Sequence, residues 1–218
     1  MTKNSIEKAE NLKKLVNPEQ NTVKNKKIKV IGVGTGGCNA VNHMIKCGLA
    51  DVEFWLMNTD KQLLELGRTD NRILLGVKTT KGLGAGDDYE IWKQAAEESK
   101  HEIIKALEGA DMVIITTGLG GGTGTGATPV IAKIAKELGI LTVAVVTKPF
   151  TFEGKRRTTI AEEGIKNLKQ YFDKTVIIEN DKLLQVVKRT ISINETFDVT
   201  NRILSKVVIG LLKHLRHQ

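Results

Sequence analysis

The sequence predicts a three-layer Rossmann-like α/β fold, in which a parallel sheet carries helices on both of its faces. Apolar segments rich in β-branched residues alternate with segments of helical periodicity, as is typical of strands buried on both faces of a parallel sheet. Strands are expected over residues 28–33, 52–57, 110–117, 140–146 and 175–179. Three glycine-rich loops, over residues 34–39, 81–88 and 118–126, follow β-like segments. In a doubly wound sheet such loops converge at the carboxyl edge of the strands, where ligands bind.

The composition is that of a globular protein, and its basic excess is confined to the two ends. The 218 residues carry a formal net charge of +8, and they are enough for one α/β domain. Residues 1–27 hold seven lysines against three glutamates, and residues 199–218 hold four basic residues and no acidic one. Without a basic stripe and interleaved aromatic residues, this distribution does not favour nucleic acid as a partner. We expect residues 1–27 to form a mobile basic tail, because they have few apolar residues with which to dock.

The few cysteines, the scattered histidines and the lack of long apolar runs argue against a disulfide-rich, a metal-binding or a membrane-spanning protein. Cys38 and Cys47 are too few for a disulfide framework and lack the paired spacing of a zinc site. The four histidines are scattered, so we expect no metal site made of protein side chains. No run of about 18 apolar residues is present, which argues against a membrane span and direct membrane insertion. We therefore expect a reducing, cytoplasmic compartment.

The first glycine loop carries a dinucleotide-binding pattern. Gly32, Gly34 and Gly37 match the G-x-G-x-x-G fingerprint, in which glycines allow a tight turn and a close approach to a pyrophosphate. The next expected strand is followed by Asp60, placed where an acid could bind a ribose hydroxyl. An NAD-binding Rossmann protein is therefore one alternative. This alternative leaves the loop of residues 118–126 unexplained, and the sequence shows no arrangement of His, Lys or Tyr typical of catalysis in an NAD-dependent enzyme.

The loop of residues 81–88 precedes a helix expected from Ile91 through Leu107. Taken alone, such a loop marks only the start of a helix, with Asp87 or Asp88 as its cap. Because it is the third glycine loop to follow a β-like segment, we expect it to join the other two at the same edge of the sheet.

The loop of residues 118–126 is the centre of the predicted site. Six of its nine residues are glycines and two are threonines, so we expect the backbone itself, rather than side chains, to contact a ligand. A buried strand precedes the loop and a helix follows it, with Pro129 expected in the first helical turn. Such an arrangement aims free amide N–H groups and the positive end of a helix dipole at one place. The loop therefore predicts a phosphate site.

Two polar pairs follow the last two expected strands. Glu153 and Arg157 open a helix at the spacing of an i,i+4 surface ion pair. Asn180 and Asp181 follow the strand of residues 175–179, and we expect them to cap a helix or to make a polar contact.

The final element is a long helix expected over residues 194–215. One apolar stripe is widened by further apolar residues, and together they are Phe197, Leu204, Val207, Val208, Ile209, Leu211, Leu212 and Leu215. A helix with so broad an apolar surface is expected to pack on more than one side.

The chain lacks the lysine-containing phosphate loop G-x-x-x-x-G-K-[ST]. The segment Val146–Pro149 is similar to a guanine-reading loop but has no aspartate at the required position. Phosphate binding is therefore expected from backbone amides, each charge-assisted contact contributing about 1.5–3 kcal/mol.

Residues 120–126, with the sequence GGGTGTG, closely resemble the tubulin-type signature, and the chain resembles the FtsZ family of bacteria and plastids across residues 28–212. The supporting segments are residues 30–34, 58–60, 81–86, 145–150, 152–157 and 180–184. The resemblance implies a cytoskeletal GTPase that binds GTP or GDP, with Mg²⁺ held through the phosphates. It also implies head-to-tail polymerisation with itself or a full-length relative in the division ring, in the bacterial cytoplasm or the plastid stroma, and possible contact with other division proteins.

The resemblance further implies which residues bind the nucleotide. Thr35, Gly36, Gly37, Cys38 and Asn39 would cradle the α and β phosphates, and Gly120, Gly121, Gly122, Thr123, Gly124 and Thr125 the rest of the polyphosphate. Ala85 and Gly86 would face the γ-phosphate, and Glu153 and Arg157 the ribose and a neighbouring phosphate. Asn180 and Asn201 would bind guanine beside a stacking Phe197, and Asn58 and Asp60 complete the set.

Several positions depart from the family pattern. Thr35 and Cys38 stand where glycines are common, Trp92 stands for another glycine, and Glu179 stands for a proline. Asp88 and Tyr89 replace an Asn-Pro pair, and Asn201 lies where many members have Asp. We expect these departures to retune nucleotide affinity or γ-phosphate sensing.

The resemblance also implies a division of the chain and a limit on its activity. We expect a tail over residues 1–27, a GTP-binding domain over residues 28–193 and the central helix over residues 194–218, with the family's second domain absent. Members of the family hydrolyse GTP when the acidic loop of one subunit caps the nucleotide of the next, and that loop lies beyond the central helix. We therefore assign no catalytic residue and expect nucleotide binding with negligible turnover by the chain alone. An inactive assembly regulator or decoy of a full-length relative is the alternative.

Overall fold

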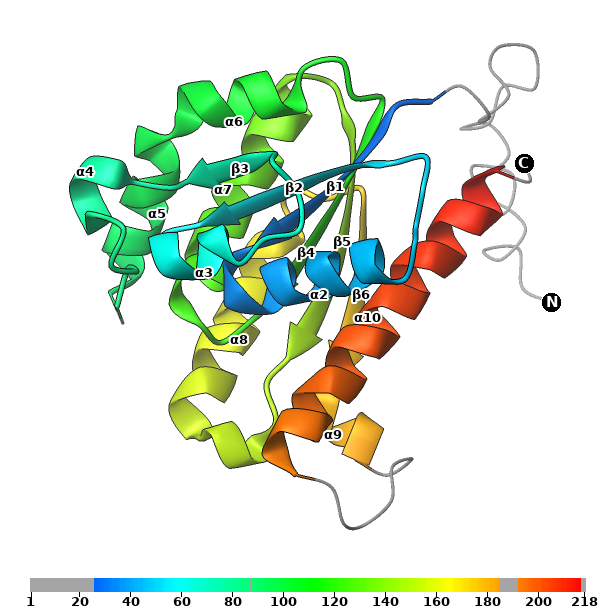
Figure 1. Ribbon diagram of the computed structural model, residues 1–218. Helices are drawn as coiled ribbons and strands as arrows, with labels where there is room; N and C mark the ends of the chain where they lie inside the picture. The colour runs from blue at the N-terminus through cyan, green and yellow to red at the C-terminus, as the bar shows by residue number, and fades with distance from the viewer. Residues whose placement is uncertain (1–25, 87, 185–191, 217–218) are drawn as a thin grey trace, which may run out of the picture.

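The computed structural model describes residues 26–86, 88–184 and 192–216 (Figure 1). Almost all of the predicted tail and the predicted cap Asp87 lie outside the described residues, as does the side chain of Leu215.

The core of the molecule is a six-stranded sheet in which all neighbouring strands are parallel (Figure 1). Its order is β3-β2-β1-β4-β5-β6. The strands are β1 Ile28–Val33, β2 Glu53–Asn58, β3 Arg72–Leu74, β4 Met112–Gly118, β5 Leu141–Lys148 and β6 Lys174–Glu179. Every residue of β1 is buried, as expected for a strand covered on both faces. The predicted fold class is confirmed.

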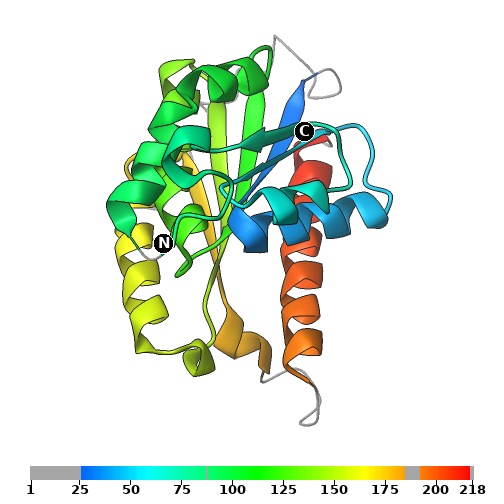
Figure 2. The same cartoon turned by 60° about the vertical axis from the view of Figure 1, so that its left-hand side comes forward.

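Helices cover both faces of this sheet, which Figure 2 shows nearly edge-on between them. The helices are α2 Gly34–Lys46, α3 Lys61–Glu65, α4 Val77–Thr80, α5 Tyr89–Glu98, α6 Lys100–Leu107, α7 Gly122–Glu137, α8 Lys155–Leu168, α9 Asn180–Leu184 and α10 Ile193–Arg216. A short 3₁₀ turn, η2, spans Thr151–Glu153. Strand residues alternate between two buried clusters: Ile31 and Ile115 pack with α5 to α8, whereas Val30 and Ile114 pack with α2 and α10.

The start of α7 differs from the sequence prediction. We expected Pro129 in the first turn, but α7 begins at Gly122 and Pro129 lies inside the helix. The glycine segment itself forms the first turns, because only glycine fits where the helix approaches β4. A Cβ added at Gly124 would lie 2.3 Å from Thr117 Oγ1 and 2.7 Å from the Gly118 carbonyl oxygen. The start of this helix is therefore set by steric demand rather than by proline.

The single helix expected from Ile91 through Leu107 is two helices. α5 and α6 meet at Ser99, whose backbone is non-helical and whose hydroxyl accepts a 2.9 Å hydrogen bond from the Gly76 amide. Ser99 is buried, and this long-range bond ties the break to the segment before α4.

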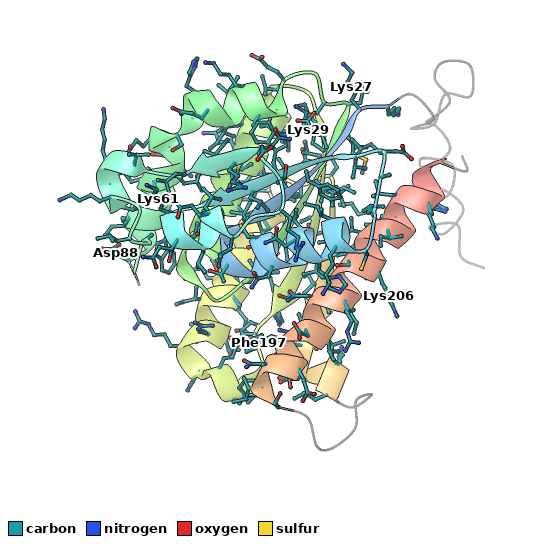
Figure 3. The ribbon with its side chains drawn as sticks, in the orientation of Figure 1. Lys27, Lys29, Lys61, Asp88, Phe197 and Lys206 are labelled. Carbon is teal, nitrogen blue, oxygen red and sulfur yellow. The ribbon has the colours of Figure 1, made fainter. Side chains whose placement is uncertain are left out.

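The final helix, α10, packs against the sheet face that carries α2. Leu204, Val208 and Leu212 are buried there, whereas Lys206 is exposed (Figure 3). A hydrogen-bonding pair, His43 Nδ1 and Ser205 Oγ at 3.0 Å, joins α2 to α10. Among the described residues, no helix is long and apolar enough to cross a membrane.

Candidate functional site

A cleft of about 860 Å³ opens at the carboxyl edge of the sheet, between the first turns of α2 and α7 and the first half of α10. Many residues predicted from the sequence line it together: Thr35, Gly36, Asn39, Gly121, Gly122, Thr123, Gly124, Glu153, Arg157, Asn180, Phe197 and Asn201. These residues come from segments far apart in the chain, and the parallel sheet brings them to one edge.

Two helix starts meet at this cleft without capping side chains. The N-cap residues of α2 and α7, Val33 and Gly121, make no side-chain capping bond, and neither helix has an acidic residue in its first turn. The first N–H groups of a helix have no partner within it, and the helix dipole makes that end positive. The two first turns therefore offer a positive surface made of backbone, which suits an anion.

Close backbone contact explains why glycines build this surface. Gly34 has a φ of +68°, and a Cβ there would lie 2.8 Å from the Gly124 nitrogen. A Cβ on Gly36 would lie 3.2 Å from the Cα of Gly118. The first and central glycine loops thus touch backbone to backbone, which larger residues would prevent.

Threonine side chains hold the two loops in place. Thr117 Oγ1 donates to the Val33 carbonyl at 2.9 Å, which joins the ends of β4 and β1. Thr125 Oγ1 accepts from the Gly120 amide at 2.9 Å, and Thr123 Oγ1 lies 2.7 Å from Thr59 Oγ1. Thr125 is fully buried, so it stabilises the central loop from behind.

The opposite end of the cleft is made of side chains from α9, α10 and the segment after β5. Asn180 is only 4% exposed, and its Oδ1 has no hydrogen-bond partner among the described residues. Phe197 lies edge-on to Phe150, with ring centroids 5.7 Å apart. A flat apolar surface beside an unpartnered amide oxygen suits a planar ring that carries N–H donors.

Glu153 and Arg157 form the predicted ion pair, with Arg157 Nη1 2.6 Å from Glu153 Oε2. Glu153 Oε1 also accepts from the Phe150 amide at 2.9 Å, so both carboxylate oxygens are engaged. The Glu153 side chain is 10% exposed and that of Arg157 is 55% exposed. The guanidinium therefore keeps donors free to meet a ligand in the cleft.

The other predicted site residues do not line the cleft; they are Gly37, Cys38, Asn58, Asp60, Ala85, Gly86, Gly120 and Thr125. Asp60 caps α3 by accepting from the Leu63 amide at 3.0 Å. The Cys38 thiol points into the core, toward the carbonyl oxygens of Gly32 and Met57, and burial raises its pKa to about 12. Ligand contacts of these residues stay a prediction.

The cleft continues along α2 into a part that sequence reasoning missed. Asn42, His43 and Lys46 line it, together with Arg68, whose backbone amide donates to Asn42 Oδ1 at 2.8 Å. Because residues three and four apart share a helix face, the positions that follow Asn39 on α2 were predictable once Asn39 was placed in the site. Arg68 carried no such signal, since it belongs to a loop after a five-residue helix.

Comparisons with known proteins agree with this geometry. The Tubulin/FtsZ family GTPase-domain model matches residues 27–188. Cell division protein FtsZ of Buchnera aphidicola (subsp. Acyrthosiphon pisum, strain APS) is 55% identical over 184 residues, which are 84% of this chain and 48% of that protein. The chain therefore spans about half the length of this curated relative.

Solved structures of related proteins have the same fold. An empty FtsZ dimer from M. jannaschii matches with a TM-score of 0.85 and 40% identity, covering 100% of this chain and 61% of that one. A GTPγS-bound protofilament of CetZ2 from Haloferax volcanii matches with a TM-score of 0.75 and 26% identity, covering 85% of this chain and 58% of that one. With its cleft at the carboxyl edge, its two uncapped helix starts and a family match over most of its length, the chain belongs to the tubulin/FtsZ family and contains that family's GTPase domain.

Proposed function

We propose that the cleft binds GTP and GDP, and that the protein to which this chain belongs acts as an FtsZ-like GTPase in head-to-tail filaments at the division site. The observation that carries the proposal is the meeting of the α2 and α7 first turns at one cleft, with neither turn capped by a side chain. The CetZ2 relative is a GTPγS-bound protofilament, which supports both the ligand and the assembly.

Polyphosphate binding rests on the backbone of the two helix starts. Thr35 and Gly36 of α2 and Gly121 to Gly124 around the start of α7 line the cleft, and the first N–H groups of a helix have no partner within it. Each charge-assisted hydrogen bond contributes about 1.5–3 kcal/mol. A few such bonds account for binding without the lysine of other nucleotide hydrolases.

Binding of the base is proposed to rest on Asn180, Phe197 and Asn201, with the amide side chains selecting guanine and the ring stacking on the base. The buried Asn180 Oδ1 needs a donor, and guanine presents N1–H and N2–H on one edge. Adenine offers an acceptor at N1, so it pairs less well with an amide oxygen. Phe197, 38% exposed on α10, provides an aromatic face for the base.

Mg²⁺ is proposed to bind through the phosphates. The described residues contain no group of three or more His, Cys, Asp or Glu side chains that could hold a metal ion. Mg²⁺ commonly keeps several waters and binds nucleotide phosphates with few protein ligands, and this preference fits a cleft whose phosphate end is backbone. When bound, the ion would neutralise phosphate charge.

Hydrolysis is proposed to require a carboxylate from a neighbouring subunit. Two described carboxylates line the cleft, Glu153 and Asp198. Both oxygens of Glu153 are engaged by Arg157 and the Phe150 amide, and Asp198 adjoins Phe197 on α10. Glu153 is thus already paired and Asp198 belongs to the same part of α10 as Phe197, so we expect turnover by the isolated chain to be negligible. Steady GTP hydrolysis by the purified monomeric chain would overturn this part of the proposal.

Calorimetric titration with GTP, GDP, ATP and NAD tests the ligand assignment. We expect GTP and GDP to bind at least about tenfold more tightly than ATP, because one unsatisfied buried amide contributes about 1–3 kcal/mol. Tighter binding of ATP or NAD would refute the guanine assignment.

Light scattering with a full-length FtsZ tests the assembly proposal. We expect the chain to change the extent of GTP-dependent assembly of the full-length protein and to leave GDP samples unchanged. Co-assembly that slows GTP turnover would favour the assembly-regulator alternative, and no effect at any ratio would contradict both roles.

A further inference from the structure

Trp92 lies between two glycine loops of the molecule. It belongs to α5, it is 2% exposed, and its indole Nε1 donates to the carbonyl oxygens of Ala85 at 3.1 Å and Gly86 at 2.9 Å. Both carbonyls lie at the end of the loop of residues 81–86. The indole therefore holds that end of the loop.

The start of the same loop is held by backbone bonds. The Gly82 carbonyl accepts from the Lys61 amide at 2.9 Å, and the Gly84 amide donates to the Thr59 carbonyl at 3.1 Å. These bonds anchor the loop to the segment after β2, while its second half is held by Trp92 on α5. The position of Ala85 and Gly86 thus depends on a side chain.

The Trp92 side chain also packs against the first two turns of α7. A Cβ added at Gly122 would lie 2.5 Å from Trp92 Nε1, and one added at Gly126 would lie 2.4 Å from Trp92 Cβ. The same Cβ on Gly122 would lie 2.8 Å from the Gly86 carbonyl oxygen. The two glycines leave the space that the indole fills, so loop, indole and helix start form one packed unit.

Gly122 joins this unit to the cleft, at the end away from the aromatic surface. Gly122 is the first residue of α7 and lines the cleft. Asp88, just after the loop, and Phe197, at the aromatic end, lie well apart on the molecule (Figure 3). With a base at Phe197 and phosphates at the α7 start, each added phosphate extends toward the loop of residues 81–86.

We propose that Trp92 is a positioning residue that sets how strongly the cleft prefers a nucleoside triphosphate to a diphosphate. The inference rests on the proposed nucleotide binding. By fixing Ala85 and Gly86 behind Gly122, the indole holds in place the cleft-lining start of α7, at the end of the cleft where a third phosphate would lie farther from the base than a second. Losing one or two hydrogen bonds to this wall should weaken triphosphate binding about fivefold to tenfold.

The test compares Trp92→Phe with Trp55→Phe, the latter altering the other tryptophan of the chain, on β2. Phenylalanine keeps a ring between loop and helix but removes the N–H donor. Calorimetry with GTPγS and GDP should show about a fivefold loss of GTPγS affinity in Trp92→Phe, with GDP affinity within about twofold of the unaltered chain. Trp55→Phe should keep the ratio of GTPγS affinity to GDP affinity of the unaltered chain.

A second measurement does not require the Trp92 variant to fold. In Trp55→Phe the only indole is Trp92, and its emission should change more with GTPγS than with GDP. An equal loss of both affinities in Trp92→Phe, an unchanged ratio, or identical emission with both nucleotides would overturn the inference. Failure of the unaltered chain to bind either nucleotide would instead refute the proposed function.

Discussion

The two ends of the cleft are built from different parts of the polypeptide. At the proposed phosphate end, defined here by Gly34, Gly36 and Gly121 to Gly124, the first and central loops touch backbone to backbone, and an added methyl group at Gly34 or Gly124 would collide with main-chain atoms. The base end, defined by Asn180, Phe197 and Asn201, consists of side chains on α9 and α10. Substitutions at the phosphate end should therefore remove the site as a unit, whereas those at the base end should reduce affinity in graded steps.

The largest effect is expected for Gly124→Ala. Its Cβ would lie 2.3 Å from Thr117 Oγ1 and 2.7 Å from the Gly118 carbonyl oxygen. Relief requires the start of α7 to move from β4, which should cost about 3 kcal/mol of stability, the upper part of the range for overpacking. Loss of two or more amide contacts should lower GDP affinity at least about 100-fold. Thermal denaturation and calorimetry measure the two effects.

Gly210→Ala on α10 is the matched control, because a Cβ there would meet nothing within 4 Å. It should keep GDP affinity and gain up to about 1 kcal/mol of stability, since alanine is the better helix former. Wild-type GDP affinity in Gly124→Ala would contradict the backbone account of the phosphate end.

Phe197→Ala should have the second largest effect. Stacking of a base on an aromatic ring contributes about 1–3 kcal/mol by alanine substitution and tolerates any base. We expect GTP and ATP to lose affinity by the same factor, leaving their ratio unchanged. Phe152→Ala, altering an exposed ring that stacks on Phe150 at 4.9 Å but does not line the cleft, should cost less. A change in the ratio of GTP affinity to ATP affinity in Phe197→Ala would contradict this prediction, because it would show that the ring distinguishes guanine from adenine.

Unlike Phe197→Ala, Asn180→Ala should reduce the preference of the cleft for guanine over adenine nucleotides. Removing the buried acceptor should weaken GTP binding about tenfold, the equivalent of one well-placed hydrogen bond, and affect ATP less. The selectivity for guanine should therefore fall, which competition binding measures. Asn201→Asp is the companion variant, and it should raise guanine affinity because a carboxylate accepts two N–H bonds. Equal losses for GTP and ATP in Asn180→Ala would contradict its role at the base edge.

The smallest effect concerns Cys38, just after the first turn of α2. Burial disfavours its thiolate and raises its pKa from 9.0 to about 12. Above pH 9 the unfolded chain ionises this thiol while the folded chain does not, so stability should fall as the pH rises from 9 toward 12. Urea midpoints should show this fall and show less of it in Cys38→Ala.

A thiol reagent at pH 8 should modify the exposed Cys47 and leave Cys38 until the chain unfolds. Rapid modification of both would contradict the buried position.

Much of the fold was predictable because its strands are long and apolar on both faces. The five expected strands are all present, with ends that differ by at most two residues. β3 was missed because three residues, Arg72 to Leu74, are too few to show a period. The break at Ser99 was missed because it depends on a bond to Gly76, which is distant in sequence.

The candidate site was predictable to the extent that it is made of glycine loops. The loops can be recognised in the sequence by their high glycine content. The structure places the first and central loops in contact at Gly34 and Gly124. The extension along α2 to Lys46 and Arg68, and the indole of Trp92 beneath the loop of residues 81–86, depend on how the elements pack. No local pattern in the sequence carries that information.

Hydrogen exchange of backbone amides, with and without GTPγS, tests the central claim most directly. If the polyphosphate is held by the two uncapped helix starts, the amides of residues 35, 36 and 121–124, which line the cleft, should exchange at least about tenfold more slowly in the complex, as each gains a hydrogen bond worth about 1.5 kcal/mol or more. Unchanged exchange at both segments, with protection appearing elsewhere in a chain that binds GTPγS, would contradict the account.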